Sequence, residues 1–284
     1  MMDTPIDEGI VMQNLPFRAI VSDLDGTLLN ANHVIGEFTI DTLAKLAQKN
    51  VDIILATGRN HTDVMSILDK INVKNAAMIT SNGARIHDLQ GSLLYSNNLE
   101  EKLAFEIMNM PFDATRVCVN SYQDEGWFIN IDIPALRKYH QDSGFMYDVV
   151  DFRHHHGRGT EKVFFIGKTA EDLIELEQAL KTRFGEQTAI TFSTPNCLEV
   201  MNKNVSKGTA LTHLLASRDY TPQDCIAFGD GMNDVEMLQE VGKGCVMFNA
   251  DPRLKQACPT LEQIGLNKDE AVASYIRAIF GIYQ

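Results

Sequence analysis

The sequence has few of the features that mark membrane, secreted or nucleic-acid-binding proteins. No apolar run reaches the length of about 20 residues that a helix needs to cross a bilayer, and residues 1–8 have neither the basic nor the apolar region of a secretory signal. The chain carries 25 Lys and Arg against 38 Asp and Glu, a formal net charge of −13. Because Lys and Arg supply most of the affinity for nucleic acids and anionic membranes, we expect neither as a partner.

Cysteine is scarce, and its spacing excludes the common cysteine-based sites. The five cysteines are odd in number and include no Cys-x-x-Cys pair, which disfavours a disulfide framework and a zinc site. Buried thiols in a reducing compartment are the simplest interpretation. We therefore expect a cytoplasmic protein whose free thiols are Cys118, Cys197, Cys225, Cys245 and Cys258.

What the sequence does contain is an alternation of apolar strands and amphipathic helices. Short apolar segments at 17–22, 51–56 and 76–80 each end in polar residues, and helical patterns lie between them. The same alternation returns after residue 206, with apolar segments at 225–229 and 245–248. Nearly continuous apolar strands are typical of a parallel sheet that is covered on both faces. The pattern predicts an α/β fold with a doubly wound parallel sheet, which binds ligands at the carboxyl ends of its strands.

Between these two parts the pattern changes. Segments 116–122 and 127–132 follow each other across a short polar turn, which indicates an antiparallel pair, and a strongly helical stretch follows at 171–184. We therefore expect an α+β cap domain at 85–194, inserted into a core formed by 1–84 and 195–284. Residues 1–16 show no periodicity and are expected to form a loose tail, and Met12 could serve as the start codon.

Paired carboxylates follow the first apolar segment. Side chains two residues apart on a strand point to the same side, so Asp23 and Asp25 can face one pocket, with Thr27 close by. A carboxylate can accept a phosphoryl group, and a second carboxylate can protonate a leaving oxygen and then activate water. Acidic turns with a threonine cap are also common without any function, so this pattern alone is a weak signal.

Further polar groups follow other strands. Asp230 and Asn233 come after the segment 225–229, and clustered hard oxygen ligands suit Mg²⁺. Taken alone, an Asp-Gly turn with a helix cap explains them equally well. Thr57 and Gly58 lie where a helix begins, which is a ready anion site. Lys207 begins another helix and can supply positive charge, although most lysines are simply exposed to solvent.

Together these segments resemble a known family. Residues 23–29, 57–59, 207–208 and 229–234 are similar to the four motifs of the haloacid dehalogenase-like hydrolases, in the order that superfamily uses. The long gap between the second and third motifs, preceded by residues 81–83, resembles the type IIB cap of the Cof subfamily. The resemblance extends from residue 17 to the C-terminus.

The resemblance implies a role for each matching residue. Asp23 would be the nucleophile and Asp25 the general acid and base. The expected phosphate-binding residues are Thr57, Gly58, Lys207 and Asn233. The expected Mg²⁺ ligands are Asp23, Asp230 and, through its backbone carbonyl, Asp25. Two further residues, Asp234 and Thr27, would not bind the metal or the substrate themselves but would hold the residues that do.

The implied function is a Mg²⁺-dependent phosphatase for small phosphorylated metabolites. It would hydrolyse phosphate monoesters, either sugar phosphates or pyridoxal 5′-phosphate, through a phospho-aspartate on Asp23. A phosphomutase of the same fold is one alternative. A receiver-like regulator that is phosphorylated on aspartate, or a non-catalytic protein that binds phosphorylated metabolites, is another. The sequence leaves the substrate ester and the oligomeric state open.

Two features of the expected cap receive a structural interpretation. The run His154, His155 and His156 cannot turn three adjacent side chains to one ion, so we expect a solvated loop rather than a metal site. Arg153 or Arg158 beside it could contact an anionic substrate if this loop overhangs the active site. Trp127 is expected in the cap core rather than as a platform for stacking.

Overall fold

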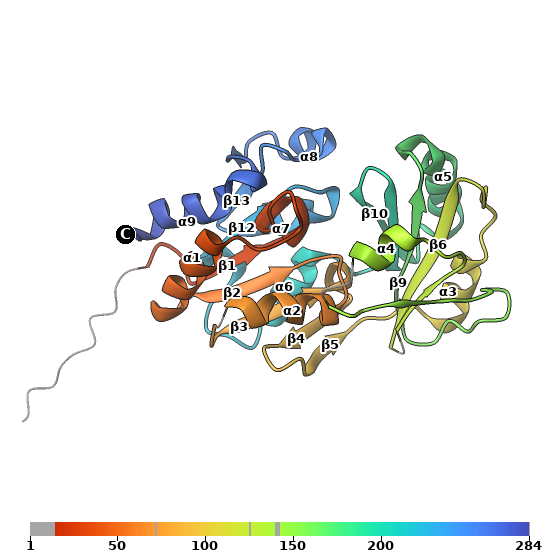
Figure 1. Cartoon of the computed structure of the whole chain (residues 1–284), viewed down its shortest axis with the longest axis horizontal. Helices are drawn as coiled ribbons and strands as arrows, with labels where there is room; N and C mark the ends of the chain where they lie inside the picture. The colour runs from red at the N-terminus through yellow and green to blue at the C-terminus, as the bar shows by residue number, and fades with distance from the viewer. Residues whose placement is uncertain (1–14, 72, 125, 140–142, 284) are drawn as a thin grey trace, which may run out of the picture.

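The computed structural model describes residues 15–71, 73–124, 126–139 and 143–283. Two β-sheets, joined by two passages of the chain, form two lobes that lie side by side (Figure 1). Most of the expected tail, residues 1–14 with Met12, lies outside the described residues. Of its last two residues, Leu15 packs against the hydrophobic core, so the chain is already anchored there.

The larger sheet has eight strands, and most of them are parallel. The order places β12 beside β1 and β1 beside β2, whereas at one edge of the sheet β4 runs antiparallel to β3 and β5 runs antiparallel to β4. In sheet order the strands are β14 (Glu262–Gln263), β13 (Lys243–Val246), β12 (Cys225–Gly229), β1 (Ala19–Ser22), β2 (Asp52–Ala56), β3 (Ala76–Thr80), β4 (Arg85–Asp88) and β5 (Leu93–Ser96).

The direction of winding reverses at β1. From β1 the chain moves through β2 to β3 with α1 and α2 between, and it later returns on the other side of β1 through β12 and β13. Right-handed crossovers in opposite directions place their helices on opposite faces of a sheet. Accordingly α1 packs beside α2 and α9, while α6 packs beside α7. The helices are α1 (Glu37–Gln48), α2 (His61–Ile71), α6 (Lys207–Leu215), α7 (Val235–Glu240), α8 (Pro252–Ala257) and α9 (Ala271–Phe280).

Burial explains why the central strands have so few polar residues. All four residues of β1 and all five of β12 are buried, because helices cover both faces of the sheet. Polar side chains therefore begin only where these strands end. The expected α/β fold with a doubly wound parallel sheet is confirmed, and its winding reversal lies at β1 and β12, where such sheets bind ligands.

The smaller sheet belongs to the inserted α+β cap. Its neighbouring strands are antiparallel except for the parallel pair β7 and β8. In sheet order they are β10 (Thr188–Thr194), β11 (Cys197–Asn202), β9 (Thr160–Gly167), β6 (Val117–Gln123), β7 (Gly126–Ile129) and β8 (Tyr147–Val149). Helices α3 (Glu101–Met108), α4 (Pro134–Tyr139) and α5 (Ile174–Phe184) complete this lobe.

Alternate residues of the cap strands serve two different clusters. Val119 and Phe165 belong to a core that includes residues of α3 and α5, whereas Tyr122 and Phe164 belong to an aromatic cluster on the other face. This is the period of two that a strand imposes on its side chains. Trp127, which is 2% exposed, lies in the aromatic cluster, as expected of a core residue, and it also lines the cavity described below.

The strand pairing places the limits of the cap elsewhere than the expected boundaries at 84/85 and 194/195. Strand β4 pairs with β3 and β5 pairs with β4, which extends the larger sheet to Ser96, while β11 pairs with β9 and keeps the chain in the smaller sheet as far as Asn202. The reason is that 85–96 forms a local hairpin, and its sequence pattern resembles that of the antiparallel cap. Only the pairing partner of a strand distinguishes the two sheets.

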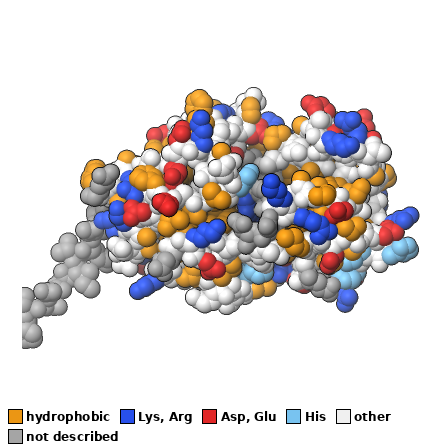
Figure 2. Space-filling model, in the orientation of Figure 1, with side chains coloured by type: hydrophobic (Ala, Val, Ile, Leu, Met, Phe, Trp, Pro, Cys, Tyr) orange, Lys and Arg blue, Asp and Glu red, His pale blue; other side chains and the backbone are white. Residues whose placement is uncertain are grey.

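Two features of the surface bear on possible partners. Within the described ranges, no helix is both long and apolar enough to cross a membrane. On the face shown in Figure 2, lysine and arginine side chains are interspersed with acidic ones rather than gathered in one basic stripe. The expectation that the chain does not bind nucleic acid stays a prediction.

Candidate active site

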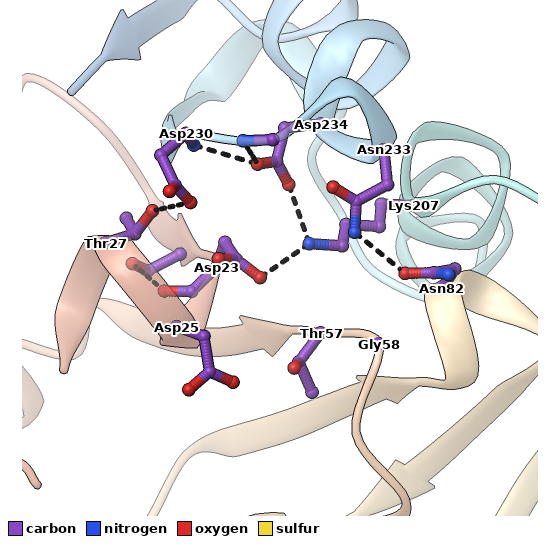
Figure 3. A network of polar contacts seen from close by, with 12 residues as sticks. Asp23, Asp25, Thr27, Thr57, Gly58, Asn82, Lys207, Asp230, Asn233 and Asp234 are labelled. Carbon is purple, nitrogen blue, oxygen red and sulfur yellow. Dashed lines mark hydrogen bonds and ion pairs between the residues drawn. The ribbon is translucent and has the colours of Figure 1, made fainter. Parts of the chain in front are cut away.

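Asp23 and Asp230 stand at the centre of the candidate site. Each follows a strand directly, Asp23 after β1 and Asp230 after β12, and these two strands are paired neighbours. The two carboxylates therefore meet at the reversal point of the sheet (Figure 3). The structure thus brings these two predicted residues together, although they are separated by about 200 positions in the sequence.

Lys207 links the acidic groups. Its side chain is fully buried, and its ammonium nitrogen lies 2.6 Å from Asp23 Oδ1 and 2.7 Å from Asp234 Oδ1. Burial alone would lower the pKa of Lys207, but the charges of Asp23 and Asp234 outweigh it and raise this pKa. The ammonium is therefore held in its charged form beside Asp23. Lys207 is the first residue of α6, which Ser206 caps by accepting a hydrogen bond from Thr209 N at 3.1 Å.

Three carboxylates form an acidic cluster. Ligand atoms of Asp23, Asp230 and Asp234 all lie within 4.8 Å of one another. Asp234 Oδ2 accepts hydrogen bonds of 2.9 Å from the backbone N–H groups of Asp230 and Gly231, which fixes its carboxylate behind the loop. The side chain of Asp25, a predicted ligand only through its backbone carbonyl, is not part of this cluster.

The chemistry of the cluster fits a divalent metal. Burial first, and then the charges of neighbouring carboxylates, raise the pKa of Asp230; burial and Asp234 raise that of Asp23 against the opposing effect of Lys207. A cation placed between these groups would stabilise their ionised forms. Their donors are hard carboxylate oxygens, the type that magnesium prefers.

Gly26 and Thr27 shape the turn between Asp23 and Asp230. Thr27 Oγ1 donates a hydrogen bond of 3.0 Å to Asp230 Oδ1, which supports the predicted role of Thr27 behind the site. Gly26 has a φ of 77°, a conformation that favours glycine. A Cβ atom at this position would lie 2.1 Å from Asp230 Oδ2.

We therefore expect Gly26→Ala to weaken metal binding, and by more than a loss of folded protein would explain. The added methyl must displace the Asp230 carboxylate, so the Mg²⁺ concentration that gives half-maximal activity should rise at least about tenfold, the effect of roughly 1.4 kcal/mol. Gly144→Ala is a matched control, because Gly144 has a similar φ of 70° but no atom within 4 Å of its added Cβ. Equal Mg²⁺ requirements in the two variants would contradict the role assigned to Gly26.

Asp25 is turned away from the acidic cluster (Figure 3). Its two carboxylate oxygens accept hydrogen bonds from Arg59, at 2.6 Å from Nε and 2.5 Å from Nη2, and one of them lies 3.0 Å from His33 Nδ1. Sequence reasoning included Arg59 in a motif without giving it a role, and it missed His33. No spacing or pattern marks His33, because a loop brings it back to the site.

Thr57 and Gly58 lie across the site from the acidic cluster and line the same cavity. Thr57 Oγ1 accepts a hydrogen bond from Arg59 N at 3.1 Å, and Thr57 O accepts one from Asn82 N at 2.9 Å. This loop precedes α2, so N–H groups near the start of a helix are available to an anion. Asn233 lines the cavity as well, so three of the four predicted phosphate-binding residues reach its wall, and the fourth, Lys207, is buried behind it.

The cavity lies between the two sheets and has a volume of about 640 Å³. The core contributes the candidate catalytic residues, and the cap contributes both apolar and charged groups. The cap residues on its wall are Tyr122, Trp127, Leu136, Lys162, Phe164, Ile166, Ser193, Thr194, Asn196, Cys197 and Glu199. Sequence reasoning did not single out Lys162 or Glu199, because nothing local distinguishes a charged residue on a strand.

The loop with three histidines lies elsewhere. Of the described residues that line the catalytic cavity, none is Arg153, Arg158 or one of the three histidines. Arg153 forms an ion pair of 2.7 Å with Asp151 and, together with the histidines and part of α3, lines a separate hollow. The hypothesis that these arginines contact the substrate is therefore wrong for this arrangement. His155 of this loop packs against Phe128, which belongs to the cap core and not to the aromatic cluster that lines the cavity.

The doubly wound sheet, the acidic cluster at its reversal point and the inserted cap define a class of protein, the capped α/β phosphatases. A family model described as haloacid dehalogenase-like hydrolase matches residues 20–276, and the chain belongs to this family. The predicted family, fold class and enzyme class are thereby confirmed.

Similar proteins and structures agree with this assignment. A Haemophilus influenzae protein named "Putative phosphatase" is 68% identical over 95% of this chain and 99% of its own length. An Escherichia coli protein named HMP-PP phosphatase is 38% identical over 91% of this chain and 94% of its own. A haloacid dehalogenase-like hydrolase from Bacteroides thetaiotaomicron shares the fold with a TM-score of 0.78 at 24% identity, over 93% of this chain and all of its own.

Proposed function

We propose that this protein is a Mg²⁺-dependent phosphatase that hydrolyses small phosphate monoesters through a phospho-aspartate on Asp23. The observation that carries the proposal is the buried ion pair of 2.6 Å between Lys207 and Asp23, which is itself one of three clustered carboxylates. Lys207 neutralises part of the charge that would otherwise repel an incoming phosphate. A carboxylate in this position is a competent phosphoryl acceptor.

Each residue of the site has a proposed task in phosphoryl transfer. The Asp23 carboxylate attacks phosphorus, and the ester oxygen leaves. The phosphoryl oxygens receive hydrogen bonds from the Thr57 hydroxyl, the Gly58 N–H, the Lys207 ammonium and the Asn233 amide. Magnesium held by Asp23, Asp230 and the backbone carbonyl of Asp25 would supply positive charge to offset the charge of the phosphoryl oxygens.

Asp25 is the proposed proton carrier. It gives a proton to the leaving ester oxygen, and it then takes a proton from the water that attacks the phospho-aspartate on Asp23. Its pairing with Arg59 and its contact with His33 hold the carboxylate on the cavity side of the site. That position is the one from which it could reach a leaving group seated under the cap.

The wall of the cavity indicates the kind of leaving group. Tyr122, Trp127 and Phe164 present rings near the catalytic residues, with Leu136 and Ile166 beside them. Apolar and aromatic surface of this kind suits a flat organic group better than a fully hydroxylated sugar. We therefore propose ring-bearing metabolites such as pyridoxal 5′-phosphate ahead of sugar phosphates. The phosphatase relative named for HMP-PP makes that compound a further candidate.

Phosphate release from a panel of esters tests this proposal. We expect turnover of pyridoxal 5′-phosphate and HMP-PP with kcat/KM at least about tenfold above that of a hexose phosphate, a difference typical of one or two well-placed apolar contacts. Chelation of Mg²⁺ should lower turnover by at least about 100-fold, because charge neutralisation at the phosphate is then lost. Release that is equally fast with chelator would contradict the metal requirement, and a preference for the hexose phosphate would contradict the proposed substrate class.

A further inference from the structure

A buried ion pair of the cap reaches into the core next to the phosphate-binding loop. Glu199 on β11 and Lys162 on β9 pair with each other, and their side chains are each 3% exposed. Lys162 Nζ donates a hydrogen bond of 2.7 Å to the carbonyl oxygen of Gly58. Glu199 accepts a hydrogen bond from the side-chain amide of Asn82 in the core. Two cap side chains thus hold two core segments that surround the site.

The core segment held by Glu199 has an unusual backbone. Ser81 and Asn82 have φ values of 49° and 58°, and residues other than glycine seldom adopt this backbone region. Ser81 Oγ donates a hydrogen bond of 2.5 Å to Glu161 on β9, so each of the two residues is held by a cap carboxylate. Ser81 N and Asn82 N donate to Arg59 O and Thr57 O at 3.0 and 2.9 Å. The turn is therefore hydrogen-bonded to the backbone of the phosphate-binding loop and holds that loop in place.

The direction of each hydrogen bond, from donor to acceptor, fixes the orientation of the Asn233 side chain. An ionised carboxylate only accepts hydrogen bonds, so Asn82 must turn its Nδ2 toward Glu199 and its Oδ1 away. That oxygen accepts a hydrogen bond of 2.9 Å from Asn233 Nδ2 (Figure 3). An amide nitrogen carries two N–H groups, so one of them remains for another acceptor. Asn233 lies on the wall of the catalytic cavity.

We propose that Glu199, Asn82 and Asn233 form an amide relay, in which Glu199 is a positioning residue for the reaction. The cap carboxylate fixes the orientation of the Asn82 amide, and Asn82 in turn fixes the orientation in which Asn233 directs an N–H to the substrate phosphate. The relay rests on the proposed function, because it assigns a task within phosphate binding. It also makes that binding depend on the cap being seated on the core.

Exchanging the amide and the carboxylate between positions 82 and 199 tests the relay, first one position at a time and then at both, which leaves the total charge unchanged. Asn82→Asp puts a carboxylate against Glu199 and removes the donor between them, so kcat/KM for p-nitrophenyl phosphate should fall roughly 10- to 100-fold, as for a lost hydrogen bond to a charged group. The inhibition constant of inorganic phosphate should rise by a similar factor. Glu199→Gln alone keeps an acceptor for Asn82, so we expect a loss of less than about tenfold.

The double variant Asn82→Asp with Glu199→Gln is the decisive one. The new amide at position 199 can donate to the new carboxylate at position 82, which still accepts from Asn233, so the orientation of Asn233 is restored. We expect kcat/KM at least about tenfold above that of Asn82→Asp alone, a coupling typical of residues in one hydrogen-bond network. Asn202→Asp is the matched control, because Asn202 lies on the same strand as Glu199 but donates to Asn98 O at 2.9 Å.

Thermal midpoints of all variants separate the relay from a loss of folding. If Asn82→Asp does not fold, Asn82→Gly, which suits the positive φ, removes the amide and should raise the inhibition constant of phosphate by the same factor. A double variant no more active than Asn82→Asp, or an Asn82→Asp variant as active as Asn202→Asp, would overturn the relay while native turnover persists. Absence of turnover in the native protein with Mg²⁺ would instead overturn the proposed function, and the relay with it.

Discussion

Asn in place of Asp23 is expected to abolish phosphate release, with kcat falling at least about 1,000-fold, because the amide cannot accept the phosphoryl group as a carboxylate does. The fold should survive this change. Asp23 is one of three clustered carboxylates, and Lys207 still keeps Asp234 as an ion-pair partner when Asp23 is neutral. Removing one of several like charges reduces their repulsion, so the free energy of unfolding should stay equal or rise.

Paired measurements of turnover and thermal unfolding check this expectation. Asp219→Asn makes the same chemical change on the surface, at a side chain that is 80% exposed and paired only with exposed Arg18 in the contacts described. It should leave both quantities at native values. Turnover by Asp23→Asn within about tenfold of native would contradict Asp23 as the nucleophile, whatever the stability of the variant.

Met in place of Lys207 is expected to have the largest effect on stability. Lys207 is fully buried between Asp23 and Asp234, at 2.6 and 2.7 Å, so its removal leaves buried carboxylates without a counter-charge. Breaking a buried pair in this way costs about 3–5 kcal/mol. Turnover should be lost as well, because the incoming phosphate would meet three carboxylates without the ammonium of Lys207 beside Asp23.

A surface lysine provides the comparison. Lys45 pairs with Asp41 at 2.9 Å one helical turn away, and both side chains are partly exposed. Lys45→Met should change the free energy of unfolding by no more than about 0.5 kcal/mol and leave turnover intact. Denaturant unfolding of both variants gives the two free energies. If Lys207→Met were as stable as Lys45→Met, the ion pairs of Lys207 would not support the site.

The parts of the site that the sequence predicts are those attached to the ends of strands. Asp23 and Asp230 follow buried apolar segments, and parallel strands meet with their carboxyl ends at one edge, so local pattern and sheet geometry together bring them close. Thr57 follows β2 directly in the same way, and Lys207 is the first residue of α6. Such residues can be found because their position depends on short-range pattern.

The parts that the sequence does not predict depend on contacts between the two lobes. Glu199 and Lys162 lie on cap strands with nothing local to distinguish them, and only the seating of the cap on the core brings them to Gly58 and Asn82. The cap boundaries differ for a related reason, since the hairpin of β4 and β5 shows which sheet it joins only through its pairing with β3. Long-range pairing, rather than residue type, decides both.

The most direct test of the account is chemical trapping of the intermediate. Native protein mixed with a hydrolysed ester and Mg²⁺, quenched in acid during the first turnover and digested, should carry one phosphoryl group on the peptide that contains Asp23, and Asp23→Asn should carry none. Mass spectrometry of the peptides reads the result. A phosphoryl group on any other residue, or turnover with no labelled peptide in rapidly quenched samples, would contradict a phospho-aspartate on Asp23.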